Sequence, residues 1–217
     1  MELKGKRVLF LGDSITEGAA ASSPQKIFHK LLKKTLGLNE AINCGVGGTR
    51  IARQKKPSEI PSYDEDFNLR YDHANVQDVL VVFGGTNDYG HGNAPLGVST
   101  DRSPDTFFGA LHLLCTKALR DYGQDNVFFV TPLRRKNDEN PLGEGKKTLP
   151  GAPLREYAAA IRETASYFGF HIVDLFAESR LNPNLPESEK YFADGLHPTD
   201  DGHKLLADIL AEAILKA

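Results

Sequence analysis

Short apolar runs alternate along the chain with longer segments in which apolar residues recur at helical spacing. The five runs lie at residues 8–11, 41–44, 79–83, 127–130 and 171–175. Runs of this length predict β-strands, and their alternation with helical segments is typical of βαβ units. The third and fourth runs are nearly all apolar, as expected of strands that are covered on both faces. The pattern therefore predicts an α/β fold with a five-stranded, mostly parallel sheet.

Four helices are expected between and after these strands. Ser103 and Pro104 predict the start of one, because a capping hydroxyl followed by proline suits a first helical turn. Its apolar face repeats every 3.6 residues and consists of Phe107, Phe108, Leu111, Leu114, Cys115, Ala118, Leu119 and Tyr122. The other three are expected at residues 25–36, ended by Gly37, at 153–168, ended by Gly169, and after Pro198, with Leu205, Leu206, Ile209, Leu210 and Ile214 facing inward.

Three connections are unusually long, at residues 53–72, 89–102 and 134–152. Most connections in compact domains have about 4–6 residues, and longer ones are usually functional or disordered. All three follow the C-terminal ends of predicted strands, where ligands bind in open parallel sheets. We expect that they could wall a pocket there, although mobile surface insertions remain an alternative, above all for residues 134–152.

Composition narrows the class of protein. The chain has 217 residues, of which 40% are hydrophobic and 25% charged, and a net charge of −3 with both signs mixed along it. These values predict one globular domain over residues 1–217 and indicate neither a nucleic-acid nor an anionic-membrane partner. No 18-residue apolar span predicts a transmembrane helix, and the N-terminus lacks an apolar signal region, so a cytoplasmic location is expected.

Two cysteines are too few for a disulfide framework. Cys115 lies on the apolar face of a predicted helix and is expected in the core. Cys44 lies beside a glycine-rich turn, where a small buried packing residue is the simpler interpretation than a thiol nucleophile.

Candidate chemistry begins at the end of the first strand, in the sequence Gly12-Asp13-Ser14. An apolar run that stops at such a turn places the Ser14 hydroxyl beyond the C-terminal edge of the sheet, so Ser14 is a candidate nucleophile. The alternative is a serine that caps the next helix. Asp194 and His197 could decide between them, because the Asp-x-x-His spacing lets a carboxylate hold one imidazole nitrogen and leaves the other as a general base.

Acyl transfer also needs donors for the developing oxyanion. The second strand ends in a glycine-rich stretch from Asn43 to Thr49, where backbone N–H groups can approach a ligand closely. The third strand ends in Gly84-Gly85-Thr86-Asn87-Asp88, which supplies the amide of Asn87. Either stretch alone would indicate only a turn.

Taken in order, these short blocks resemble the SGNH hydrolases, also called the GDSL esterase/lipase family. The resemblance covers nearly the whole chain, with Ile15 where the family name has leucine. It implies a flavodoxin-like three-layer α/β/α sandwich with strand order 2-1-3-4-5. It implies Ser14 as nucleophile, His197 as base and Asp194 as orienting acid. It also implies an oxyanion hole formed by the Ser14 N–H, the Gly48 N–H and the Asn87 side chain, with Gly47 as the alternative to Gly48.

Other chemistries fit the sequence less well. Asp13 could be an aspartyl-phosphatase nucleophile, but Ile15 stands where a second aspartate is needed, so we interpret Asp13 as a turn-fixing residue. Asp88 is interpreted as structural. The glycines at 45–48 lack dinucleotide-binding spacing, and no G-x-S-x-G surrounds Ser14.

No metal-ligand spacing is present among His73, His91, His112 and His203, and neither a metal nor another cofactor is predicted. His91 is a possible substrate contact or a solvated loop residue. His203 is expected to cap or pack in the last helix.

The sequence thus predicts a serine esterase that cleaves small acyl esters, acetyl foremost, of a soluble substrate such as an acetylated carbohydrate. A lysophospholipase or thioesterase on the same scaffold, or a catalytically inactive binding module, are the alternatives. The sequence does not indicate an oligomeric state.

Overall fold

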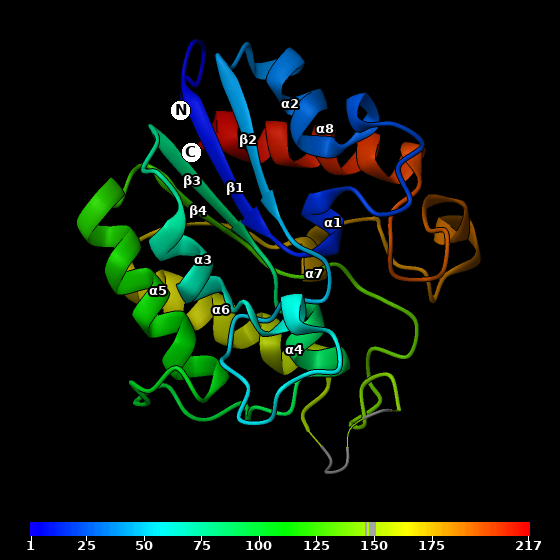
Figure 1. Ribbon diagram of the computed structural model, residues 1–217. Coiled ribbons are helices and arrows are strands. Elements are labelled where there is room, and N and C mark those ends of the chain that lie inside the picture. Colours follow the sequence, from blue (N-terminus) through cyan, green and yellow to red (C-terminus); the bar gives the residue numbers. More distant parts are fainter. Residues whose placement is uncertain (146, 148–150) are drawn as a thin grey trace.

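A five-stranded parallel sheet forms the centre of the molecule in the computed structural model, which describes residues 1–145, 147 and 151–217 (Figure 1). The strands are β1 (Arg7–Gly12), β2 (Glu40–Gly45), β3 (Val79–Phe83), β4 (Val127–Val130) and β5 (His171–Val173). Their order is β2-β1-β3-β4-β5, and all four neighbouring pairs are parallel. The predicted fold class and the strand order implied by the resemblance are confirmed.

Helices cover both faces of the sheet. They are α1 (Ser14–Glu17), α2 (Phe28–Leu36), α3 (Phe67–His73), α4 (Thr86–Gly90), α5 (Phe107–Tyr122), α6 (Leu154–Phe168), α7 (Leu175–Glu178) and α8 (Asp200–Lys216), with short 3-10 turns at Pro24–Lys26, Pro61–Asp64 and Pro186–Tyr191. One layer contains α2 and α8, and the other contains α3, α5 and α6 (Figure 1).

The side chains of each covered strand point alternately to the two faces of the sheet, so two hydrophobic cores form. Leu9 and Leu11 of β1 pack on the side of α3, α5 and α6, whereas Val8 and Phe10 pack on the side of α2 and α8. Because successive side chains of a strand point to opposite faces, a strand covered on both sides must be apolar throughout. Cys115 is fully buried in the first core, as predicted, and Cys44 is half-buried against it.

Three predicted boundaries are wrong by two residues or more. The helix expected over residues 25–36 starts only at Phe28, because Ile27 is extended and separates it from a 3-10 turn. The helix expected from Ser103 starts at Phe107, because Thr106 caps it by accepting from the Gly109 N–H. The fifth strand ends at Val173 instead of residue 175, because the next residue, Asp174, caps α7.

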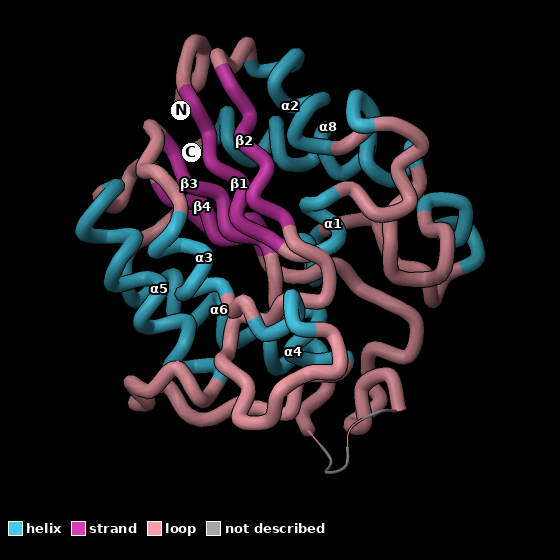
Figure 2. Tube along the Cα trace, in the orientation of Figure 1, coloured by secondary structure: helices cyan, strands magenta, loops and turns pink. Residues whose placement is uncertain are grey.

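The predicted long connections also need correction. Residues 53–72 hold the 3-10 turn Pro61–Asp64 and most of α3, and residue 89 already lies in α4. Within 134–152, residues 146 and 148–150 lie outside the described residues. Much of the loop structure gathers at the edge of the sheet where the strands end (Figure 2).

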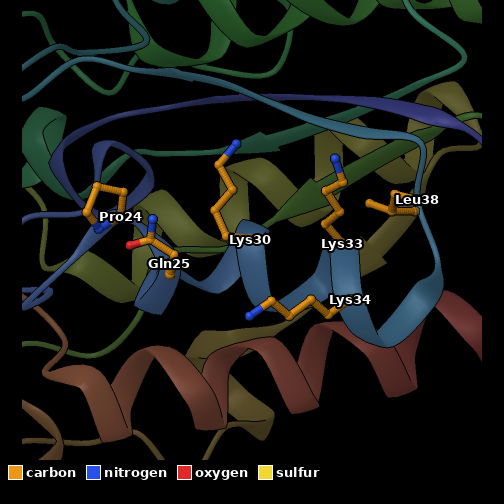
Figure 3. Close-up of a pocket in the computed structure, with 6 residues that line it drawn as sticks. All are labelled: Pro24, Gln25, Lys30, Lys33, Lys34 and Leu38. Carbon is orange, nitrogen blue, oxygen red and sulfur yellow. The ribbon is translucent and has the colours of Figure 1, made fainter.

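The edge strand β2 is protected on its open side by α2. The Lys30 ammonium donates to the Ala41 carbonyl at 3.1 Å, and a charged side chain at a sheet edge discourages pairing with another chain. Lys30 and Lys33 point to the same side of α2 (Figure 3). They line a pocket together with Pro24, Gln25, Lys34 and Leu38. None of the residues lining this pocket belongs to the predicted site.

Candidate active site

The turn after β1 carries Ser14 at the first position of α1. The Asp13 carboxylate is buried and accepts from the Ile15 N–H at 3.0 Å, so Asp13 caps this short helix and Ser14 does not. A side chain at Gly12 would meet Thr16 Oγ1 at 2.0 Å and the Phe83 carbonyl at 2.9 Å, which explains the glycine before the turn. The alternative interpretation of Ser14 as a helix cap is therefore wrong.

Residues from opposite ends of the chain meet at Ser14. The Ser14 Oγ lies 2.9 Å from His197 Nε2, and His197 Nδ1 lies 2.7 Å from Asp194 Oδ2. Because a carboxylate can only accept, Nδ1 carries the hydrogen and Nε2 is left to accept from the Ser14 hydroxyl. The three residues form a continuous chain of hydrogen bonds.

Asp194 is held by its own turn. Its Oδ1 accepts from the N–H groups of Leu196 and His197 at 2.9 and 2.8 Å, and Gly195 has a φ of +80° that suits the tight bend. Burial opposes the ionisation of Asp194, but the hydrogen bonds from His197 and Leu196 outweigh it and hold the pKa below its ordinary value. The carboxylate is therefore negative at neutral pH, as an orienting acid must be.

The glycine-rich turn after β2 uses nearly all of its N–H groups. Gly45 donates to Asn43 Oδ1, Val46 to the Gly12 carbonyl, Gly47 to Glu17 Oε2 at 2.9 Å, and Thr49 to the Val46 carbonyl. Among the described residues, none accepts from the Gly48 N–H. The same holds for the Ser14 N–H, which lies in the first turn of a helix. This difference favours Gly48 over Gly47 as the predicted donor.

The third candidate donor, the side-chain amide of Asn87, lies in α4. Its side chain is buried, and Nδ2 donates to the Thr49 carbonyl at 3.0 Å. An amide nitrogen has two hydrogens, so this bond orients the group and leaves the second hydrogen for another acceptor. The structure thus links Asn87 to the residue that follows Gly48.

A tyrosine that the sequence analysis overlooked covers Gly48. An added Cβ at Gly48, whose φ is +75°, would lie 2.0 Å from the Tyr63 ring. His91 stacks on Tyr63 with 5.5 Å between ring centroids, and its Nδ1 lies 3.3 Å from Nη1 of buried Arg50. His91 therefore packs against the ring that covers Gly48, and its contact with substrate stays a prediction.

Buried charges lie beneath these groups. Burial raises the pKa of Asp13 to about 6, despite the hydrogen bond from Ile15 and the nearby charge of Arg70. Burial likewise raises the pKa of Asp88 to about 6, although Asp88 accepts from the N–H groups of Ile51 and Ala52 at 2.9 Å. Both carboxyl groups fix backbone, which agrees with the structural roles expected from the sequence.

Arg70 was also missed, because residues 53–72 were interpreted as a loop. The signal was present: Asp66 can cap a helix, and Phe67, Arg70 and Tyr71 have helical spacing. Asp66 does accept from the Leu69 N–H, and Arg70 is buried at the ends of β1 and β2.

Two further observations concern cofactors and membranes. Within the described part of the chain, no group of three or more His, Cys, Asp or Glu side chains could hold a metal ion. No helix among those residues is long and apolar enough to cross a membrane. His203 is fully buried in α8 and stacks on Phe28. Of the two expected roles, capping or packing in the last helix, it therefore has the packing role.

Comparison with known proteins identifies the family. A model of the GDSL-like Lipase/Acylhydrolase family matches residues 10–205, and the chain therefore belongs to this family. The protein is accordingly a carboxylic ester hydrolase. No protein with curated annotation matches the chain.

Solved structures share the fold over nearly their whole length. A protein from Lactobacillus plantarum is 27% identical, with 98% of each chain covered and a TM-score of 0.82. A lipase/acylhydrolase from Enterococcus faecalis is 20% identical, with 96% of this chain and 95% of that chain covered and a TM-score of 0.66. A catalytic mutant of an acetylxylan esterase from Geobacillus stearothermophilus is 17% identical, with 99% and 96% covered and a TM-score of 0.64.

Proposed function

We propose that this ester hydrolase is a serine esterase that removes small acyl groups, acetyl foremost, from a soluble polar small molecule such as an acetylated carbohydrate. The observation that carries the proposal is the chain of hydrogen bonds from Asp194 through His197 to the Ser14 hydroxyl, with distances of 2.7 and 2.9 Å. Two N–H groups without acceptors among the described residues, at Ser14 and Gly48, accompany it.

In the first half of the reaction, Ser14 Oγ forms a bond to the ester carbonyl carbon while His197 Nε2 takes the hydroxyl proton. The carbonyl oxygen becomes an oxyanion, which accepts from the Ser14 N–H, the Gly48 N–H and Asn87 Nδ2. When the tetrahedral intermediate collapses, the bond to the alcohol oxygen breaks and His197 gives that oxygen its proton. The acyl group remains on Ser14.

In the second half, a water molecule replaces the alcohol. His197 Nε2 takes a proton from the water as its oxygen bonds to the acyl carbon, and the same three donors hold the second oxyanion. Collapse breaks the bond to Ser14 Oγ, which recovers the proton from His197. The products are a carboxylic acid and free enzyme, so the cycle needs no co-reactant besides water.

The surroundings of Ser14 support a polar substrate with a small acyl group. The Tyr63 ring lies directly on Gly48, so space beside that donor is restricted. The site is also open to water, since 54% of the Asp194 side chain and 23% of the His197 side chain are exposed. An acetylxylan esterase with the same fold is consistent with such a substrate class.

The test is hydrolysis of p-nitrophenyl esters from acetyl to decanoyl by the wild type and by Ser14→Ala, with and without a chelator. We expect metal-independent cleavage that is fastest for acetyl, falls with chain length and is abolished in Ser14→Ala, whose fold is checked by circular dichroism. Persistent activity in that variant would refute the nucleophile. Fastest cleavage of decanoyl would favour a lysophospholipase or thioesterase, and failure of a fluorophosphonate probe to label Ser14 would favour an inactive binding module.

A further inference from the structure

We propose that Arg70 is a positioning residue for the oxyanion hole: its buried guanidinium sets the relative placement of all three donors without touching the substrate. The inference rests on the proposed function. It assigns a role to α3, which contributes none of the groups in the reaction described above.

The contacts of Arg70 join the ends of two strands to the glycine-rich turn. Its Nη2 donates to the Gly12 carbonyl at 2.9 Å and to Thr49 Oγ1 at 2.8 Å, and its Nη1 donates to the Cys44 carbonyl at 2.6 Å. Its Nε donates to the Glu65 carbonyl at 3.1 Å. The residue is 9% exposed, so water competes little for these bonds.

Two of these contacts, to Gly12 and to Thr49, lead to the three oxyanion donors. Gly12 lies two residues before Ser14, and its carbonyl also accepts from the Val46 N–H. Thr49 follows Gly48 directly, so fixing its hydroxyl fixes the orientation of that turn. The Thr49 carbonyl accepts from Asn87 Nδ2, which extends the same network to the third donor.

The chemistry of the side chain suits this task. A guanidinium is planar and has five N–H donors in a fixed fork, whereas an ammonium has three donors at one point. One lysine could not reach the carbonyls of Gly12 and Cys44 in this geometry while also donating to Thr49. Arg70 therefore holds three backbone segments at defined distances.

A buried cation is also a poor choice for stability alone. Burying a charge costs free energy, and an apolar replacement of similar volume often serves a core as well or better. Burial lowers the pKa of Arg70, while Asp13 opposes that shift most strongly among the neighbouring charges. The placement of this cation beneath the donors indicates a role in their geometry.

The expected consequence concerns turnover more than substrate binding. The hydrogen bond between Ser14 and His197 contains no atom of Arg70, so replacing Arg70 removes no direct contact of the nucleophile or the base. A misplacement of about 1 Å among groups that stabilise a transition state can cost about 10²-fold in rate. We therefore expect a loss in kcat with little change in KM.

The experiment compares Arg70→Met, Arg70→Gln and Arg70→Lys with Tyr71→Phe as the matched control. Tyr71 neighbours Arg70 on α3 and donates its hydroxyl to Asp121 at 2.9 Å, so this control also removes a hydrogen bond of that helix. We measure kcat and KM for p-nitrophenyl acetate per folded molecule, and Ki for a trifluoromethyl ketone, whose tetrahedral adduct needs the oxyanion donors.

For Arg70→Met we expect kcat about 10²-fold lower, KM within about threefold and Ki raised in parallel with the loss in kcat. Arg70→Gln should resemble it, Arg70→Lys should lie between, and Tyr71→Phe should match the wild type. If Arg70→Met does not fold, the Gln and Lys variants decide. Wild-type kcat and Ki in the folded variants would overturn the positioning role.

Ser14→Ala separates this result from a failure of the proposed function. Activity that survives Ser14→Ala would overturn the serine mechanism, and the role of Arg70 with it. Loss of activity in Ser14→Ala together with full activity in the Arg70 variants would overturn the positioning role alone.

Discussion

The amino and carboxyl ends of β1 are held by different kinds of contact. At the amino end, the Arg7 N–H donates to Asp78 and the Arg7 side chain pairs with Glu40 at 2.8 Å, with both side chains 49% exposed. At the carboxyl end, Asp13 and Arg70 are buried beside the turn that carries Ser14.

This difference separates an exposed contact of small expected effect from buried contacts beside the candidate site. An exposed ion pair is cheap to form and contributes little, because water screens it. A buried charge is costly and is retained where its geometry matters. Perturbed pKa values gather at functional sites for the same reason. Substitutions at the two ends should therefore differ in which property they change.

The largest expected effect is that of Asn87→Ala at the carboxyl end. If Nδ2 donates to the oxyanion, its removal should lower kcat for p-nitrophenyl acetate by about 10²–10³-fold. Asn87→Asp is the companion variant, since it keeps the shape but replaces the donor by an acceptor, and it should be at least as impaired. A change confined to KM would make Asn87 a binding residue instead.

The next effect concerns the pH dependence of stability. The pKa of Asp13 is raised to about 6 by burial, so its protonated form stabilises the fold at low pH, and this contribution disappears as the pH rises through 6. Asp13→Asn cannot titrate, yet its Oδ1 can still accept from the Ile15 N–H. Relative to the wild type, the variant should gain about 1–3 kcal/mol of unfolding free energy between pH 4 and pH 8.

The measurement is urea unfolding of both proteins across that range. The difference between the two curves isolates Asp13, because other groups titrate alongside it. Burial, for example, lowers the pKa of His29 to about 4, so this residue makes the protein less stable as the pH falls from 6.5 towards 4. Wild-type and variant stabilities that run parallel with pH would contradict the prediction.

The smallest effect is expected at the amino end. Arg7→Met removes the exposed pair with Glu40 while keeping the backbone bond to Asp78. We expect a loss below about 1 kcal/mol, a fall in Tm of no more than about 4 °C and an unchanged kcat. Addition of salt should shrink the difference further. A loss in kcat comparable to that of Asn87→Ala would break the comparison between the two ends.

The strands and helices were predictable because length and periodicity together distinguish covered strands from amphipathic helices, whereas the strand order came from the family resemblance. Residues 79–83 and 127–130 match β3 and β4 at both ends. The predicted ends of elements were wrong where a local hydrogen bond sets the end. Thr106, for example, caps α5 in place of Ser103. Helix α3 was missed because it is short and its apolar positions, Phe67 and Tyr71, lie among charged residues that were interpreted as a loop.

The site was predictable only where the chemistry is carried by residue type. Ser14, His197 and Asp194 lie together as expected, and their roles remain predictions. Gly48 could not be separated from Gly47 by sequence, because the difference lies in a hydrogen bond from Gly47 to Glu17 across the turn. Tyr63 packs on Gly48 through a contact that no local sequence pattern predicts, whereas Arg70 lies on a helix whose cap and spacing were present in the sequence but were interpreted as a loop.

The contact between Ser14 and His197 joins residues 183 positions apart, whereas His197 and Asp194 are three positions apart. During synthesis, the acid and base can therefore pair within their own turn, but the nucleophile meets the base only after residue 197 has left the ribosome. Contacts of such long range form late and at high entropic cost. Esterase activity should therefore appear only after the contact between Ser14 and His197 has formed. A nascent chain stalled before residue 197 should have no esterase activity.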